Sequence, residues 1–285
     1  DLASVSGGTF HLLDLAPAPD PDNDELRRVA SDRDALKREL FERLRAAGER
    51  ATPAMVEKQI ALLDRGSSAL SGIEAIHASG GTAVYRQLDL TDPGAVSAVI
   101  DEIRQRHPRI DVLLHAAGIE ISHTLPDKEE REFDLVCDVK CDGWFNLLAA
   151  IGDMPLGAAI VFSSVAGRFG NLGQTDYAAA NDLLCKSVSA MRSTHPDTRA
   201  IAIDWTAWAD IGMASRGSIP QMMAQAGIDM LAPQAGIPVI RRELSAGATR
   251  GEVLIASGLG FMLAERDAAG GLDVEQFGAD ALVRR

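Results

Sequence analysis

The chain has 285 residues, a formal net charge of −13 and an apolar fraction of 46%. That length suits a single α/β domain, and the apolar content can fill its core. The negative charge argues against binding to nucleic acid or to anionic membrane surfaces, because both are recognised through basic patches. No apolar run has the length of a membrane span and no signal peptide is visible, so the sequence predicts a cytoplasmic protein.

The first residues predict a helix end followed by a strand. Residues 1–8 resemble the tail of a helix that ends in a glycine cap, and residues 9–15 have the composition of a strand. Asp14 closes this strand. Prolines then punctuate residues 17–21, which predicts extended backbone. One interpretation of Asp14 is therefore a simple turn residue ahead of Pro17.

Two helices are predicted next. Ser31 and Asp34 resemble a capping box ahead of a helical apolar repeat. Thr52 followed by proline is typical of a helix cap and first helical position. The helix that starts there is predicted to end near Gly80.

Apolar segments bounded by turn residues predict further strands along the rest of the chain. These segments comprise residues 83–90, 110–117, 200–205 and 252–256. A helix from Asp92 to His107 separates the first two of them. Strands that alternate with helices predict a parallel sheet. His115 is predicted to pack at the end of its strand rather than to act as a base.

The segment from Ile160 to Asn181 contains the strongest functional signal. Its apolar run ends at Ser163 and Ser164, which predicts a buried strand that delivers side chains to the crevice at the carboxyl edge of the sheet. A glycine-punctuated loop follows, and Tyr177 opens an alanine-rich helix. Tyr177 and Asn181 are four residues apart and therefore share one helix face. A strand-end hydroxyl and a helical phenol can thus converge on one substrate oxygen.

The helix predicted over residues 133–151 carries Lys140 and two of the three cysteines. Cys137 and Cys141 are four residues apart, but no histidine or second cysteine pair completes a metal site with them. We therefore predict no metal and interpret these thiols and Cys185 as reduced and buried.

The pattern resembles the short-chain dehydrogenase/reductase superfamily, and more narrowly the ketoreductase domains of type I polyketide and polyunsaturated fatty-acid synthases. Ordinary members of the superfamily carry Tyr-x-x-x-Lys, whereas here Asn181 stands in the place of that lysine. Lys140 stands upstream, where ordinary members have asparagine. This exchange is typical of the synthase ketoreductases. The resemblance implies a Rossmann-like doubly wound parallel sheet, with Ser164, Tyr177, Lys140 and Asn181 as catalytic residues.

The resemblance also implies a domain organisation. It covers residues 9–263 and makes residues 1–285 a single ketoreductase catalytic domain, with a helical insertion at 18–52 and a methionine-containing substrate lid at 212–236. The family's first strand and its glycine-rich pyrophosphate turn would precede Asp1. We therefore expect the chain to be part of a longer polypeptide.

A nicotinamide cofactor follows from the same resemblance. The residues implied for cofactor binding are Asp14, Asp89, Leu90, Ala116, Ala117, Gly118, Lys140, Tyr177 and Trp208. Asp14 can accept hydrogen bonds from the adenosine ribose hydroxyls of NADH and would repel the 2′-phosphate of NADPH. Synthase ketoreductases usually use NADPH, but the ten residues after Asp14 contain no arginine. The sequence therefore predicts that NADH is preferred over NADPH.

Ketone reduction needs a hydride donor, a proton donor and support for the developing oxyanion. The assignment makes Tyr177 the general acid, gives Ser164 a second hydrogen bond to the oxyanion, and lets Asn181 position Lys140 or a bridging water. A free phenol has a pKa of ~10, so we expect the charge of Lys140 to lower the pKa of Tyr177.

The sequence thus predicts a ketoacyl reductase that converts a β-ketoacyl thioester into the β-hydroxyacyl thioester. The expected partner is an acyl carrier protein within a larger multidomain synthase, with Arg168 and Arg216 as candidate carrier contacts. Two alternatives stay open: a stand-alone short-chain dehydrogenase of another alcohol or ketone, and a non-catalytic scaffolding fragment of a synthase. The acyl chain length, the stereochemistry of the product and the oligomeric state are not predicted.

Overall fold

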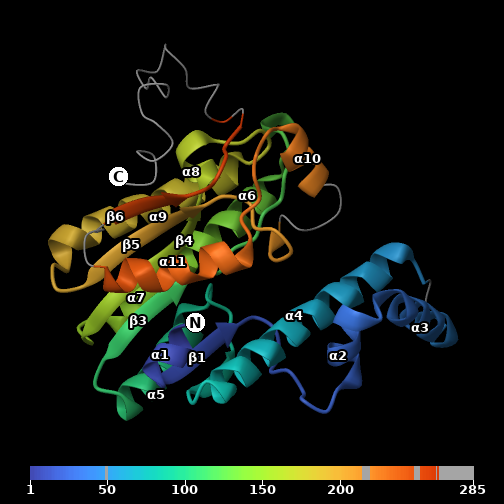
Figure 1. The fold of residues 1–285 in the computed structure, drawn as a ribbon, viewed down its shortest axis with the longest axis horizontal. Helices are drawn as coiled ribbons and strands as arrows, with labels where there is room; N and C mark the ends of the chain where they lie inside the picture. Colours follow the sequence, from blue (N-terminus) through green and yellow to red (C-terminus); the bar gives the residue numbers. More distant parts are fainter. Residues whose placement is uncertain (49–50, 214–218, 247–250, 261, 263–285) are drawn as a thin grey trace. The chain divides into compact units, whose positions relative to one another are not determined.

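A computed structural model describes residues 1–48, 51–213, 219–246, 251–260 and 262 (Figure 1). It has a mixed α/β architecture with parallel strands, as predicted. Contacts divide the chain into two compact units, Asp1–Asp89 and Leu90–Arg285. Within the described residues, no helix combines the length and apolarity needed to cross a membrane.

The strands found in the described residues are β1 (Thr9–Asp14), β2 (Thr82–Gln87), β3 (Ile110–His115), β4 (Leu156–Ser164), β5 (Arg199–Trp205) and β6 (Gly251–Ile255). The α-helices found there are α1 (Leu2–Ser6), α2 (Asp24–Ser31), α3 (Arg33–Ala46), α4 (Pro53–Ala78), α5 (Pro93–Arg106), α6 (Glu130–Cys137), α7 (Gly143–Ile151), α8 (Val165–Phe169), α9 (Thr175–Thr194), α10 (Ile219–Gln225) and α11 (Pro233–Ser245). A 3₁₀ turn, η1, spans Leu125–Asp127, and a π-helical turn, η2, spans Asp138–Asp142.

In the first unit, β1 and β2 form a parallel pair. Their register runs from Thr9 opposite Thr82 to Asp14 opposite Gln87. Helix α1 precedes them and ends at Gly7, which adopts φ 58° as the predicted glycine cap requires. The predicted start of the chain is therefore confirmed.

The helices of this unit correct one prediction. The expected capping box at Ser31 is wrong, because Ser31 lies in the last turn of α2. The helix predicted after it is confirmed as α3, which begins at Arg33 with Asp32 as its N-cap residue. The second predicted helix is confirmed, since the Thr52 side chain accepts a hydrogen bond from the Met55 amide at the start of α4. Buried apolar residues on α2, α3 and α4 form a core of their own: Val29, Leu36, Leu40, Leu44, Val56 and Ile60.

The second unit contains a parallel sheet in the order β3-β4-β5-β6 (Figure 1). Alternation along β4 divides its core between two faces. Ala159 and Val161 pack with residues of α7 and α9, whereas Ile160 packs on the other face with residues of α11. Helices thus cover both faces, as a doubly wound sheet requires. The carboxyl ends of β3, β4 and β5 consequently share one edge.

Two further segments differ from their predicted form. The single helix expected over residues 133–151 is three pieces, since α6 passes through the π-turn η2 into α7. Of the predicted lid at 212–236, residues 214–218 lie outside the described part of the chain. The described remainder contains α10 and the first turn of α11.

Candidate functional site

Ser164 and Tyr177 meet at the carboxyl edge of the second unit's sheet. Ser164 is the last residue of β4 and caps α8, with its Oγ accepting a hydrogen bond of 3.2 Å from the Ala166 amide. Tyr177 lies in the first turn of α9. Its phenol interacts with the side chains of Ser164 and Asn181. The strand-end hydroxyl and the helical phenol therefore converge.

Tyr177 packs in an apolar cluster. The buried members are Val136, Cys141 and Ala180, and the partly buried ones are Ile119, Ile121, Cys137 and Tyr177 itself. Burial raises the pKa of Tyr177, and the nearby polar side chains of Asn181 and Ser164 work in the opposite direction without reversing it. The expected lowering of this pKa by Lys140 is therefore wrong, because desolvation is the largest influence on the phenol and the charge of Glu120 adds to it. The phenol holds its proton firmly at neutral pH.

Lys140 lies in the π-turn η2, an irregularity that frequently marks functional positions in helices. Its side chain is buried, with only 3% of the residue exposed. The ammonium donates a hydrogen bond of 2.9 Å to the Phe162 carbonyl and lies 5.5 Å from the centroid of the Tyr177 ring. Burial lowers the pKa of Lys140 to about 8, so the charged form still predominates at neutral pH. A buried cation thus faces the phenol ring.

Asn181 is fully buried on the same face of α9 as Tyr177. Its Nδ2 donates a hydrogen bond of 2.7 Å to the Tyr177 carbonyl. Its Oδ1 is a buried acceptor with no partner among the described residues. Such an acceptor is costly unless a donor completes it, which points to a ligand or proton-relay position.

The loop after β3 brings small residues next to Lys140. The His115 Nε2 hydrogen-bonds the Lys140 carbonyl at 2.8 Å, and burial lowers the pKa of His115 to about 4. The ring is therefore neutral and packs, as predicted. Ala116 and Ala117 lead to Gly118, where an added Cβ would lie 3.0 Å from Cε of Lys140. Glycine at this position thus allows the loop to approach the lysine closely.

Leu90 and Trp208 also belong to the second unit. The Leu90 carbonyl accepts a hydrogen bond of 2.9 Å from Nδ2 of Asn146, a residue that the sequence analysis did not single out. The Trp208 ring lies 4.7 Å from that of Trp205 and packs over Gly236 in α11. The structure thus gives Trp208 an apolar packing role, and its contact with a nicotinamide ring stays a prediction.

The two remaining predicted cofactor residues, Asp14 and Asp89, belong to the first unit. Asp14 Oδ1 accepts a hydrogen bond from the Ala16 amide at 2.7 Å and lies 2.8 Å from the Arg65 guanidinium of α4. The sequence argument for NADH considered only residues that closely follow Asp14 and missed Arg65. An arginine therefore does lie beside this carboxylate.

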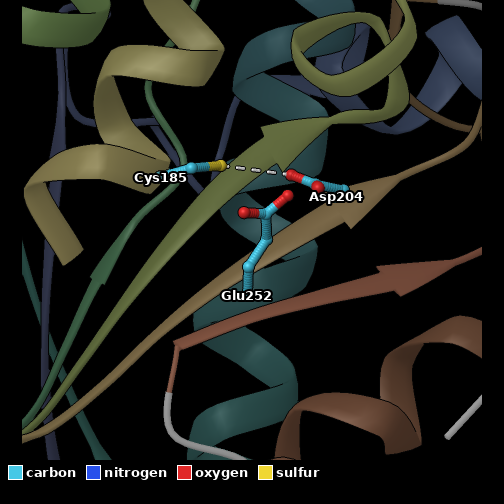
Figure 2. A group of neighbouring side chains, drawn as sticks. All are labelled: Cys185, Asp204 and Glu252. Carbon is cyan, nitrogen blue, oxygen red and sulfur yellow. Dashed lines mark hydrogen bonds between the residues drawn. The ribbon is translucent and has the colours of Figure 1, made fainter. Parts of the chain in front are cut away.

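A second cluster of ionisable groups lies in the second unit, where Cys185 of α9 meets Asp204 of β5 and Glu252 of β6 (Figure 2). Their ligand atoms lie within 4.8 Å of one another, and Cys185 Sγ is 3.4 Å from Asp204. Burial raises the pKa of Cys185 to about 12 and that of Asp204 to about 7. A metal ion that bound here would have to displace the thiol proton and the proton of Asp204.

The same cluster bears on the predicted carrier contacts. Arg168 forms an ion pair with Glu252, so its guanidinium is already engaged. Arg216 lies outside the described residues. The structure thus offers a local role for Arg168 that does not involve a carrier protein.

The second unit thus combines helices on both faces of a parallel sheet with serine, tyrosine and a buried lysine at its carboxyl edge, where open α/β sheets bind ligands. The family model described as the KR domain matches residues 45–210. The chain therefore belongs to the ketoreductase domain family.

Individual relatives agree with this assignment. The chain is 31% identical over 193 residues to polyketide synthase PksN of Bacillus subtilis, covering 65% of this chain and 3% of PksN. It is 27% identical over 258 residues to a polyunsaturated fatty acid synthase polypeptide of Thraustochytrium, covering 89% of this chain and 9% of that polypeptide. The chain thus spans a small fraction of the length of these relatives.

A solved ketoreductase domain from the bacillaene assembly line superposes with a TM-score of 0.62 at 25% identity. The match covers 71% of this chain and 49% of that one.

Proposed function

We propose that the chain reduces the ketone of a β-ketoacyl thioester to the β-hydroxyacyl thioester, with a nicotinamide cofactor. The observation that carries this proposal is the convergence of Ser164, a partly buried, protonated Tyr177 and a buried Lys140 in a chain of the ketoreductase family. When bound, the cofactor supplies the hydride that reaches the carbonyl carbon. The small residues at the β3 loop and the unpartnered Asn181 Oδ1 beside the phenol fit a ligand at this edge.

The protein's own groups handle the oxyanion and the proton. Tyr177 hydrogen-bonds the ketone oxygen and transfers its phenolic proton as negative charge develops there. Ser164 donates a second hydrogen bond to the same oxygen. Lys140, held by the Phe162 carbonyl, stabilises the tyrosinate that remains until a solvent proton replaces the one transferred. Asn181, whose Oδ1 is open, fits the relay that returns this proton.

We further propose NADH as the preferred cofactor. Asp14 supplies a carboxylate for the ribose hydroxyls, and a carboxylate there opposes a 2′-phosphate. Arg65 moderates this preference, because its guanidinium lies 2.8 Å from the carboxylate and brings positive charge to the same place.

We also propose that the substrate arrives on an acyl carrier protein within a multidomain synthase. The support comes from the relatives, which are polyketide and polyunsaturated fatty acid synthases far longer than this chain.

The assay uses the full-length protein with a β-ketobutyryl thioester and follows oxidation of NADH and NADPH. Reduction of the thioester is the expected result. Turnover of simple ketones without the thioester would instead identify a stand-alone dehydrogenase. Failure to bind either nucleotide would identify a non-catalytic scaffold.

A further inference from the structure

A buried ion pair lies directly beside the proposed proton donor. Lys128 follows η1 and precedes α6, and its Nζ lies 2.7 Å from Oδ2 of Asp176 in the first turn of α9. Their side chains are only 2% and 0% exposed. Neither residue carries a role in the proposed chemistry. Charges buried this completely require paired, hydrogen-bonded surroundings.

Asp176 holds the backbone of Tyr177. Its Oδ1 accepts a hydrogen bond of 2.8 Å from the Tyr177 amide. Amides of the first helical turn have no partner within the helix and are usually satisfied by the N-cap side chain. The N-cap of α9 is Gln174, which makes no such bond. Asp176 therefore supplies the capping acceptor, and its charge suits a helix N-terminus.

Lys128 extends the same anchor to the loop after β3. Its Nζ also donates a hydrogen bond of 2.6 Å to the Ile121 carbonyl. Ile121 and Tyr177 belong to one apolar cluster, so Lys128 fixes a residue that packs in the same cluster as the phenol ring. A second link joins the two segments, where the His123 amide donates to the Gly173 carbonyl at 3.0 Å.

We infer that Lys128 and Asp176 are positioning residues that lock Tyr177 and the loop at residues 119–124 into one rigid unit. The inference rests on the proposed function and deepens it. A buried ion pair generally adds little stability over apolar residues of similar volume. This pair fixes the position of the Tyr177 backbone relative to Lys128, because one oxygen of the Asp176 carboxylate binds the Tyr177 amide and the other binds the lysine. Proton transfer is sensitive to small misplacements of the donor, so the pair acts on turnover.

The experiment compares a double variant with a matched control. Lys128→Met/Asp176→Asn removes both charges together, because removing one alone would leave the other buried and unpaired. Lys128→Arg tests rescue by a conservative change, since arginine can donate to both acceptors. The control is Lys186→Met/Asp182→Asn, which removes an exposed pair of the same helix α9, with side chains 61% and 44% exposed. Each protein is measured for kcat, KM, cofactor Kd and amide hydrogen exchange.

For the double variant we expect kcat to fall by about tenfold or more, while cofactor Kd stays within about twofold. We also expect exchange to rise together at residues 119–124 and 175–179. Lys128→Arg retains most of kcat, and the control matches wild type. A folded double variant with wild-type kcat, or with unchanged exchange in both segments, overturns the inference. If wild type reduces no thioester, the proposed function fails, and the exchange data alone then decide the inference.

Discussion

Replacing Arg65 by alanine should strengthen the preference for NADH over NADPH. The guanidinium lies 2.8 Å from the carboxylate of Asp14, which ends β1. In wild type, the arginine offsets the repulsion between this carboxylate and a 2′-phosphate. Without it the carboxylate acts alone. Asp14→Ala should have the opposite effect and weaken the preference for NADH.

The expected size follows from the exposure of the pair. The Asp14 side chain is 30% exposed and that of Arg65 is 50% exposed, so water screens both charges substantially. A unit charge at ~4 Å from another is worth about 1 kcal/mol in water and about 4 kcal/mol near a protein surface. Half-exposed groups belong near the lower value. Since ~1.4 kcal/mol corresponds to a tenfold change, about 1 kcal/mol means that Arg65→Ala should shift the ratio of the two dissociation constants by about fivefold.

The measurement is the Kd of NADH and of NADPH by titration calorimetry on the full-length protein, at low and at high salt. Arg33→Ala is the matched control. Arg33 of α3 pairs with Asp64, which lies next to Arg65 in α4, and the two side chains of this pair are similarly exposed. It should leave the ratio unchanged. The reasoning would be refuted if Arg65→Ala shifted the ratio of the two dissociation constants toward NADPH, or if Asp14→Ala left this ratio unchanged. The effect should also shrink at high salt.

Three further predictions follow from the second unit. Tyr177→Phe should abolish most turnover, by a factor of about 100 or more, and leave cofactor Kd nearly unchanged, because the proton transfers only in the transition state; near-wild-type kcat would contradict this. Burial raises the pKa of Asp204 from 3.8 to about 7, so the folded state binds this proton more tightly than the unfolded state. Its contribution to stability, on the order of a few kcal/mol, is complete below about pH 4 and is lost as pH rises through 7. Asp204→Asn should flatten the pH dependence of the free energy of unfolding, measured with urea, over that range. An unchanged pH profile would show that Asp204 is not the group that titrates there. In Gly118→Ala, the new Cβ would lie 3.0 Å from Cε of Lys140. This crowding should lower kcat severalfold with little change in the unfolding midpoint, whereas full activity would mean that the lysine moves without consequence.

Local signals in the sequence predicted most of the elements. Thr52-Pro53 and Asp92-Pro93 each begin a helix at the expected residue, because a capping side chain and a proline act within one turn. The strand that ends at Ser164 was equally clear from its apolar run. Helix α2 was missed, although the Asn23 side chain caps it by accepting a hydrogen bond from the Glu25 amide, and the predicted capping box was placed where α2 ends.

Pairings between distant residues could not be predicted. The sequence analysis did not single out Lys128 or Asp176, because no spacing rule connects these two charged residues. Arg65 was missed for the same reason, since it reaches Asp14 from another helix. Sequence periodicity reports which face of an element is buried, but the partner of a side chain depends on how elements pack. The sequence therefore predicted the candidate site residues, but it did not predict the side chains that anchor them.

The pKa of Tyr177 shows how such an omission changes a chemical argument. The sequence supplied a cation, Lys140, and so predicted a lowered pKa. The structure adds burial of the phenol in an apolar cluster and an ammonium already bonded to the Phe162 carbonyl. Desolvation then dominates and raises the pKa. A phenol of this kind stays protonated at rest and gives up its proton only to a strong base. The oxyanion that forms as a ketone accepts hydride is such a base, so the buried site favours transfer at the transition state over loss of the proton beforehand.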